Sequence, residues 1–242
     1  DLQENIIPVV QTALQTAQLS LSDLDAIAFT QGPGLMGSLT VGTSFAKALA
    51  LALNVPLVGV HHMKAHILAH FIADASDAAP SFPFLCLTVS GGHTQIVRVN
   101  DALDMQVIGS TIDDAAGEAF DKAAKMLGLP YPGGPLIDQY AQLGNPNAFE
   151  FAKPQIKDLD FSFSGLKTSI LYTLQAAEKQ EPNLRQDKRN DLCASIQNSI
   201  VSILMAKLEK AVKQTGIQTV VIAGGVSANS ELRKRLLAKK DT

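Results

Sequence analysis

The feature that most constrains this chain is the tetrapeptide SGGH at residues 90–93, which stands between two apolar segments. Leu85, Leu87 and Val89 fall on one face of an extended chain, and β-branched residues resume after the glycines. The sequence therefore predicts two strands joined by a turn over residues 86–98. The glycines permit positive φ and expose backbone N–H groups, an arrangement that can bind a phosphate. Adjacent glycines also mark ordinary hairpin turns, so the tetrapeptide alone leaves both roles open.

Composition bounds the class of protein. With 242 residues, of which 46% are hydrophobic, the chain is long enough for one or two domains with a sizeable core. Its formal net charge of -3 indicates no general attraction to nucleic acid. Cys86 and Cys193 lie in apolar surroundings without a metal-binding spacing, which predicts reduced core thiols. No unbroken apolar run reaches the roughly 18 residues of a membrane span, and residues 1–10 do not resemble a signal peptide, so we expect a cytoplasmic protein without a membrane partner.

The N-terminal part predicts an alternation of helices and strands. Helical spacing of apolar residues covers 1–19, a short strand covers 25–30, and a small-residue helix covers 39–53. The loop between them, GPGLMGS at 32–38, can bind phosphate at the helix N-terminus. It matches neither the Walker A nor the GxGxxG pattern, and close packing of helix on sheet explains its glycines equally well.

Histidines gather in residues 61–70, HHMKAHILAH, which follow a predicted strand at 56–60. His62 and His66 are four residues apart, so on a helix they share one face, as the two zinc ligands of an HExxH motif do. Met63 replaces the glutamate of that motif, so a metalloprotease would have no general base. Histidine pairs at this spacing also occur on ordinary helices, and the pair by itself leaves the metal-binding and structural roles open.

The sequence also predicts where the chain divides. Residues 74–81, DASDAAPS, read as a surface connector. We therefore expect an N-terminal lobe over residues 1–81 and a C-terminal lobe over residues 82–242. The chain begins directly on a helix, and the amphipathic segment 230–242 ends it, so we interpret the sequence as a fragment that lacks both ends of a longer protein.

Acidic residues cluster in the segment 110–122. Asp114, Glu118 and Asp121 have the spacing of one helical face, which predicts three carboxylates side by side. Like charges on one face repel, so cations or ligand hydroxyls must compensate them, and Lys122 does so only in part. A solvated acidic face is the alternative interpretation.

The remaining segments repeat the pattern of strand, glycine turn and helix. Residues 128–135, GLPYPGGP, form a turn suited to holding a sugar or base against the main chain. Residues 160–168 predict a strand that turns into a helix, with both phenylalanines inside and both serines outside. A long amphipathic helix is predicted over 187–214. A buried strand at 219–223 ends in GGVSAN, 224–229, which caps the last helix.

Five motifs in this order resemble the tRNA N6-adenosine threonylcarbamoyltransferases, formerly called O-sialoglycoprotein endopeptidases, and the SGGHTQ and GEAFDK segments are similar to the bacterial branch. The motifs are HMKAH (62–66), TVSGGHTQ (88–95), DDAAGEAFDKAAKMLGLPYPGGP (113–135), FSFSGLKT (161–168) and AGGVSANSELR (223–233). The resemblance covers nearly the whole chain. It implies an α/β fold of the actin/hexokinase/Hsp70-like class, with two lobes that are each a mixed sheet flanked by helices.

The resemblance also implies a site and a reaction. His62 and His66 match metal-binding histidines, for Fe²⁺ or Zn²⁺, and a third ligand, an aspartate, is expected beyond residue 242. The implied reaction is metal-assisted transfer of a threonylcarbamoyl group from threonylcarbamoyl-adenylate to N6 of adenosine 37 in tRNAs that read codons beginning with adenine. No catalytic residue is assigned. The positions that match the donor-binding residues are Thr88, Val89, Ser90, Gly91, Gly92, Asp121, Gly134, Asp138 and Asn229.

The partners that the family implies are tRNA, a scaffold paralogue subunit and a small ATPase subunit. Lys64-Ala65 stands where the family usually has Glu-Gly between its histidines, which puts a cation near the expected metal. Two other classes stay open. A non-catalytic scaffold paralogue should lack the histidine pair and the glycine turns, and a small-molecule kinase of the same superfamily would bind ATP and Mg²⁺.

Overall fold

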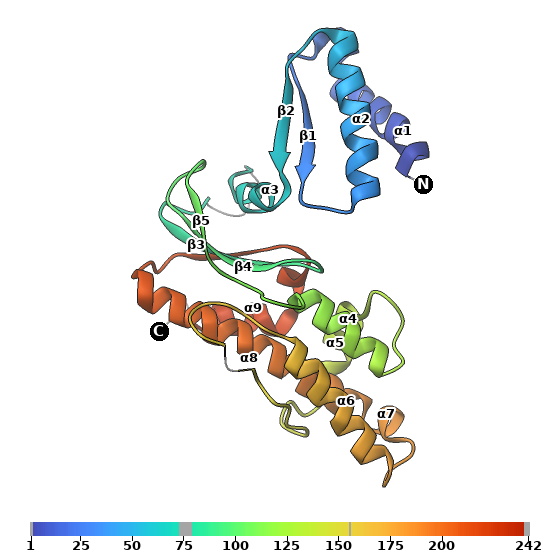
Figure 1. The fold of residues 1–242 in the computed structure, drawn as a ribbon, viewed down its shortest axis with the longest axis vertical. Coiled ribbons are helices and arrows are strands. Elements are labelled where there is room, and N and C mark those ends of the chain that lie inside the picture. The colour runs from blue at the N-terminus through green and yellow to red at the C-terminus, as the bar shows by residue number, and fades with distance from the viewer. Residues whose placement is uncertain (1, 73–78, 155, 240–242) are drawn as a thin grey trace. The chain divides into compact units, whose positions relative to one another are not determined.

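The computed structural model describes residues 2–72, 79–154 and 156–239 (Figure 1). Contacts within the chain divide it into one unit, Asp1–His70, and a second unit, Phe71–Thr242. The connector predicted at residues 74–81 lies mostly outside the described residues. The division into lobes after residue 81 therefore stays a prediction.

The first unit is a parallel strand pair joined by a helical crossover. β1 and β2 pair in parallel from Ile27 opposite Leu57 to Thr30 opposite Val60, and α2 connects them. The predicted helices and strands of this part are present, with ends shifted by a few residues. Its elements are α1 (Leu2–Ala17), a 3-10 turn (Leu21–Asp23), β1 (Ile27–Gly32), α2 (Met36–Leu53), β2 (Leu57–His61) and α3 (His62–Leu68).

The crossover helix α2 is the most apolar helix of this unit. The helix ends at Leu53. The next residue, Asn54, caps it: Asn54 adopts a left-handed conformation and donates its N–H to carbonyls of the last turn. Within the described residues, one helix, α2, is both long enough and apolar enough to cross a membrane, with a mean hydropathy of 1.3. Core helices of globular domains meet the same criteria, so length and composition do not place α2 in a bilayer. An apolar cavity of about 770 Å³ lies between α1, α2 and β1.

The second unit is built on a mixed four-stranded sheet, in the order β5-β4-β3-β6. β3 and β4 form the predicted antiparallel hairpin, and β6 pairs with β3 in parallel. This confirms the strand-turn-strand prediction for residues 86–98. The elements are β3 (Phe84–Val89), β4 (Thr94–Val99), β5 (Met105–Ser110), α4 (Ala116–Met126), α5 (Gly133–Ala141), α6 (Ser164–Glu178), α7 (Leu184–Asp187), α8 (Arg189–Thr215), β6 (Val220–Ala223), a 3-10 turn (Gly225–Ala228) and α9 (Ser230–Ala238).

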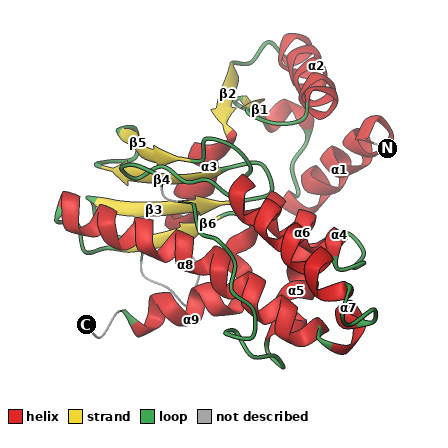
Figure 2. Cartoon of the chain, turned by 60° about the horizontal axis from the view of Figure 1, so that its bottom comes forward, coloured by secondary structure: helices red, strands yellow, loops and turns green. Residues whose placement is uncertain are grey.

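The core of this unit lies between the sheet and the helices. α8 and α9 run along one side of the sheet in both views (Figures 1 and 2). Every residue of β3 is buried, and α8 is buried around most of its circumference rather than along the single stripe that an amphipathic helix would show. Each buried aliphatic side chain contributes about 1.5 to 3 kcal/mol, so this packing fixes the strand ends that precede the turns.

The two cysteines belong to this core, as predicted. Cys86 lies in β3 and Cys193 in α8, and neither side chain is exposed. Burial raises the pKa of Cys86 to about 11 and that of Cys193 to about 12. Both thiols are therefore protonated and unreactive at neutral pH.

Residues 160–168 were predicted as a strand that turns into a helix, and only the helical part is confirmed. Phe161 makes a single bridge with Thr111, and α6 begins at Ser164. Both phenylalanines are buried as predicted, but Ser162 is only 7% exposed rather than facing solvent. The carboxylate of Asp113, two residues after Thr111, accepts the hydrogen bond of the Ser162 hydroxyl, and that bond makes burial of the hydroxyl possible.

Candidate functional site

The turn between β3 and β4 is closed by its own serine. The N–H of Ser90 donates to the His93 carbonyl at 2.8 Å, and the N–H of His93 donates to Ser90 Oγ at 3.1 Å. Neither Gly91 nor Gly92 is among the described residues with positive φ, so the left-handed backbone that glycine permits is not used in this turn. Both glycines are exposed, and a Cβ at either would meet nothing within 4 Å. The space in front of this turn is open.

Other parts of the chain approach the turn very closely. The N–H of Gly117, in the first turn of α4, donates to the Ser90 carbonyl at 3.2 Å, and a Cβ on Gly117 would come within 2.7 Å of that oxygen. Thr94, the first residue of β4, accepts the N–H of Ala116 on its hydroxyl at 2.8 Å. On the β6 side, Gly224 has φ of +91°, and a Cβ there would overlap the Val89 carbonyl. The turn is therefore held between α4 and the end of β6.

Asp121 lies on α4 and connects it to α5. Its Oδ1 accepts the N–H of Gly133 at 2.8 Å and the N–H of Gly134 at 3.3 Å, the first two residues of α5. A carboxylate is favourable there because unpaired N–H groups and the helix dipole point toward it. Gly133 itself is required for packing, since a Cβ there would overlap the side chain of Ala124.

The acidic cluster predicted on one helical face is separated in the structure. α4 begins at Ala116, so Asp114 precedes the helix and does not share a face with the other acids. Lys122 donates to Asp114 at 2.7 Å and lies 2.8 Å from Glu118, which neutralises both. The prediction was wrong because the helix starts later than the charge spacing suggested.

Asp138 connects α5 to α9 in the same way. Its two carboxylate oxygens accept the N–H and the hydroxyl of Ser230, the first residue of α9. Asn229 is the N-cap of α9, and its Oδ1 accepts the N–H of Leu232 at 3.0 Å. The predicted binding residues Asp138 and Asn229 therefore meet at one helix N-terminus.

These contacts form a closed ring, which we call the donor ring because the positions that match donor-binding residues lie on it. Ser90 contacts α4, Asp121 contacts α5, Asp138 contacts α9, and Gly224 contacts the end of β3. Two predicted site residues differ from the rest. Thr88 is fully buried, with its hydroxyl 3.6 Å from the Cys86 sulfur, and Val89 is a core residue. Their side chains support the turn rather than face the open space.

Sequence reasoning missed Asp113 as a structural residue of this region. Its carboxylate accepts the hydroxyl of Ser162 and, at 2.8 Å, the N–H of Phe163, and so ties the start of α6 to the loop before α4. Burial alone would raise the pKa of Asp113, but hydrogen bonds from Ser162 and from neighbouring backbone N–H groups outweigh it and lower the pKa.

Replacing Asp113 by alanine is expected to lower the free energy of unfolding by about 1 to 2 kcal/mol, because the buried Ser162 hydroxyl loses its acceptor. The lowered pKa means that the contribution of this carboxylate is complete above its ordinary pKa of 3.8 and disappears as pH falls through the folded-state value. Urea unfolding at neutral and acidic pH measures both effects. Asp101→Ala is the matched control, since Asp101 also accepts two backbone N–H groups but on an exposed turn. Equal losses for the two variants would contradict the prediction.

The histidine pair lies on α3 in the first unit. The Nε2 atoms of His62 and His66 are 3.2 Å apart, and the ring planes are inclined by 68°. Met63 and Ile67, on the adjacent face of the helix, are buried and fix its orientation, while His61 is exposed. The predicted helix and the shared face of the pair are confirmed.

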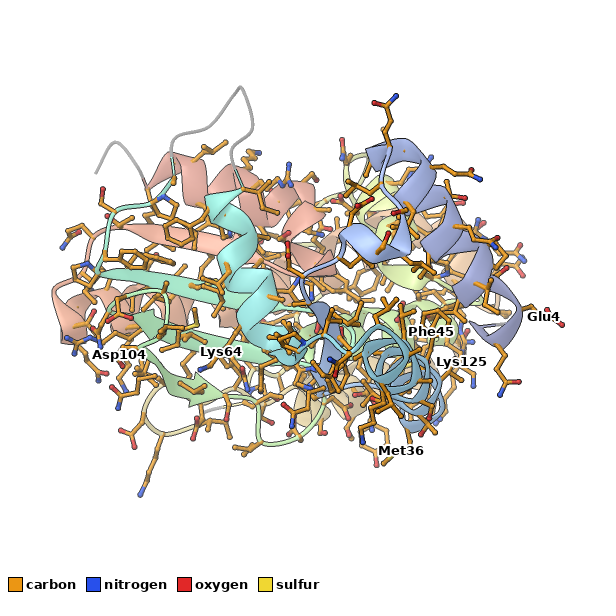
Figure 3. The ribbon with its side chains drawn as sticks, turned by 90° about the horizontal axis from the view of Figure 1, so that it is seen from above. Glu4, Met36, Phe45, Lys64, Asp104 and Lys125 are labelled. Atoms are coloured by element: carbon orange, nitrogen blue, oxygen red, sulfur yellow. The ribbon has the colours of Figure 1, made fainter. Side chains whose placement is uncertain are left out.

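The spacing of the two nitrogens fits ligands of a single metal ion. Two nitrogens bound at about 2.05 Å with a tetrahedral angle between them are about 3.3 Å apart. The same distance also allows one imidazole to donate a hydrogen bond to the other. Within the described residues, no group of three histidine, cysteine or acidic side chains forms a complete metal site. Lys64 is exposed on the same helix (Figure 3).

Comparison with known proteins defines the class. The family model described as tRNA N6-adenosine threonylcarbamoyltransferase matches residues 1–242. Relatives with that name include proteins of Christiangramia forsetii, 61% identical, and Riemerella anatipestifer, 58% identical, each matched over 97% of this chain and 69% of its own length. A crystal structure of full-length HypF in the phosphate- and nucleotide-bound form has a TM-score of 0.62 at 14% identity, and covers 97% of this chain and 44% of that one.

The chain has a mixed sheet flanked by helices and shares its fold with HypF, and together with the family match this gives the predicted α/β fold of the actin/hexokinase/Hsp70-like class. Within that class, the chain belongs to the tRNA N6-adenosine threonylcarbamoyltransferase family. The protein is an acyltransferase that forms N6-threonylcarbamoyladenosine in tRNA, and tRNA is its substrate.

Proposed function

We propose that the donor ring binds threonylcarbamoyl-adenylate during this reaction. The observation that carries the proposal is the convergence of motifs that are far apart in the sequence on one open turn. A Cβ at Gly91 or Gly92 would meet nothing within 4 Å, and this open space leaves room for a ligand. The proposed binding residues are Thr88, Val89, Ser90, Gly91, Gly92, Asp121, Gly134, Asp138 and Asn229, of which Thr88 and Val89 act from the core by supporting the turn.

Each part of the ring has a chemical role in this proposal. The backbone N–H groups of Gly91 and Gly92 donate to the adenylate phosphate, whose negative charge increases as the threonylcarbamoyl group leaves. Asp121 and Asp138 accept hydrogen bonds from ligand hydroxyls with the lone pairs that their helix N-termini do not use. The Asn229 amide donates one further hydrogen bond. Donors and acceptors fixed before the ligand arrives need no reorganisation during the reaction.

We also propose that His62 and His66 hold one divalent metal, Fe²⁺ or Zn²⁺, through Nε2, with an aspartate beyond residue 242 as the third protein ligand. The nitrogen spacing of 3.2 Å supports this pairing. The metal, when bound, supplies a Lewis acid that orients and polarises an oxygen of the donor. The packing of Met63 and Ile67 keeps both imidazoles on one side of α3.

The finer assignments of partners and organisation are also proposals. We propose that the two units correspond to the lobes at residues 1–81 and 82–242, and that adenosine 37 of tRNAs reading codons that begin with adenine is the acceptor. A scaffold paralogue subunit and a small ATPase subunit are proposed partners. With a net charge of -3, this chain attracts tRNA only through a local basic patch or through such partners. A tRNA substrate supports a cytoplasmic location.

The test of the donor ring uses the full-length protein with its partners, threonylcarbamoyl-adenylate and tRNA. Asp121→Asn is expected to lower kcat/KM for the donor about a hundredfold, because it removes a charged acceptor at the α5 N-terminus. Asp191→Asn is the matched control, since Asp191 also accepts a backbone N–H, that of Asn145, at 2.8 Å, but outside the ring. Equal values of kcat/KM for the two variants would show that the donor ring does not bind threonylcarbamoyl-adenylate.

A further inference from the structure

We infer that Gln197, in the middle of α8, is a positioning residue that orients the Asn229 amide for the donor. The inference rests on the proposed role of Asn229 in donor binding. Gln197 lies 32 residues before Asn229 in the sequence, and it is not among the residues that the motifs single out. Its side chain is 5% exposed, so its amide is taken out of water.

The hydrogen bonds of Asn229 determine which way its amide faces. A backbone N–H only donates, so the atom that faces the N–H of Leu232 at 3.0 Å is the amide oxygen. The amide nitrogen therefore faces Gln197, and Nδ2 donates to Gln197 Oε1 at 2.8 Å. The N-cap and the glutamine together leave one orientation for this amide.

An amide nitrogen carries two hydrogens. One of those on Nδ2 is used in the bond to Gln197, and our inference assigns the second to an acceptor on the donor molecule. Without the Gln197 acceptor, the first hydrogen has no fixed direction, and only the bond from the Leu232 N–H to Oδ1 holds the amide plane. A ligand would then have to order the amide on binding, and affinity would fall.

The surroundings of Gln197 argue against a role in packing alone. Its neighbours on α8, Ile196, Ile200 and Val201, are fully buried, and an aliphatic side chain would fill this position without the cost of burying an amide. Ser199, another buried polar residue of α8, donates to the Ser195 carbonyl of its own helix at 2.9 Å, and to no other group in the described part of the chain. Gln197 differs from Ser199 because its bond crosses to the cap of α9.

The test measures steady-state kinetics of tRNA modification by the full-length protein with its partners, with threonylcarbamoyl-adenylate as the varied substrate. Gln197→Met keeps the length of the side chain and removes the acceptor, and it is expected to raise KM for the donor about tenfold with kcat within about twofold. Gln197→Glu keeps an oxygen at the same position and is expected to restore KM to within about threefold of the wild type. Ser199→Ala, a buried polar deletion in the same helix, is expected to leave KM unchanged.

Thermal unfolding of each variant separates positioning from folding. If Gln197→Met lowers Tm but leaves KM for the donor at the wild-type value, Gln197 is only a structural residue and the inference is wrong. Asn229→Ala separates the proposed role of Asn229 in donor binding from the role inferred for Gln197. If Asn229→Ala raises KM and Gln197→Met does not, the inference alone fails. If Asn229→Ala also has the wild-type KM, the donor-binding role of Asn229 fails and the inference fails with it.

Discussion

The double variant His62→Ala/His66→Ala of the full-length protein is expected to lose its bound metal and to form at least about a thousandfold less modified adenosine than the wild type. Both imidazoles are needed because their Nε2 atoms, 3.2 Å apart, are placed as two ligands of one ion. Removing both leaves a single expected protein ligand, too few to retain a divalent ion. Elemental analysis of the purified protein measures metal content independently of activity, and nucleoside analysis of the tRNA measures the product.

His61→Ala is the control for this variant. His61 is the residue before α3 and is exposed, so its removal deletes an imidazole from the same segment without touching the pair. We expect wild-type metal content and activity for this control. A double variant that keeps stoichiometric metal would show that the ion binds elsewhere, and the histidine pair would then be a hydrogen-bonded structural feature of α3.

Replacing Gly224 by alanine is expected to lower the free energy of unfolding by about 3 to 5 kcal/mol and to abolish activity at physiological temperature. Two costs combine at this position. The backbone has φ of +91°, which side chains other than glycine rarely adopt, and the added Cβ would overlap the Val89 carbonyl. Relief requires the end of β3 to move away from β6, and this movement displaces the turn that begins at Ser90. Chemical denaturation and the modification assay measure the two effects.

Two other glycines separate the causes of that loss. Gly216 has φ of +70° with nothing within 4 Å of an added Cβ, so Gly216→Ala measures backbone strain alone, about 1 kcal/mol. Gly225 is the next residue after Gly224, and a Cβ there also meets nothing within 4 Å, so we expect Gly225→Ala to be tolerated. A Gly224→Ala protein as stable as Gly216→Ala would show that the close approach to β3 is not required.

Local patterns in the sequence predicted most of the elements. The alternation around the SGGH turn predicted β3 and β4, the spacing of apolar residues predicted α1 and α8, and the run of small residues predicted α2. The spacing of His62 and His66 predicted their shared face on α3. These predictions succeed because side-chain periodicity and turn chemistry depend on residues only a few positions apart.

Errors arose where a distant residue decides the local structure. The acidic cluster was predicted as one helical face, but the hydroxyl of Thr94 binds the first N–H of α4, and Asp114 lies before that helix. Ser162 was predicted to face solvent, but it is buried against the carboxylate of Asp113, 49 residues earlier. No periodicity within either segment carries that information.

By itself, the sequence determined the order of helices and strands, the chemical character of each turn and, through its motifs, the family. Only the tertiary structure decided that Asp121 binds the start of α5, that Asp138 binds the start of α9 across 92 residues, and that Gln197 faces Asn229. The physical reason is that a helix N-terminus presents unpaired N–H groups to whichever acceptor packing brings near it. The acceptor is selected by the packing of the buried core, which depends on the whole chain.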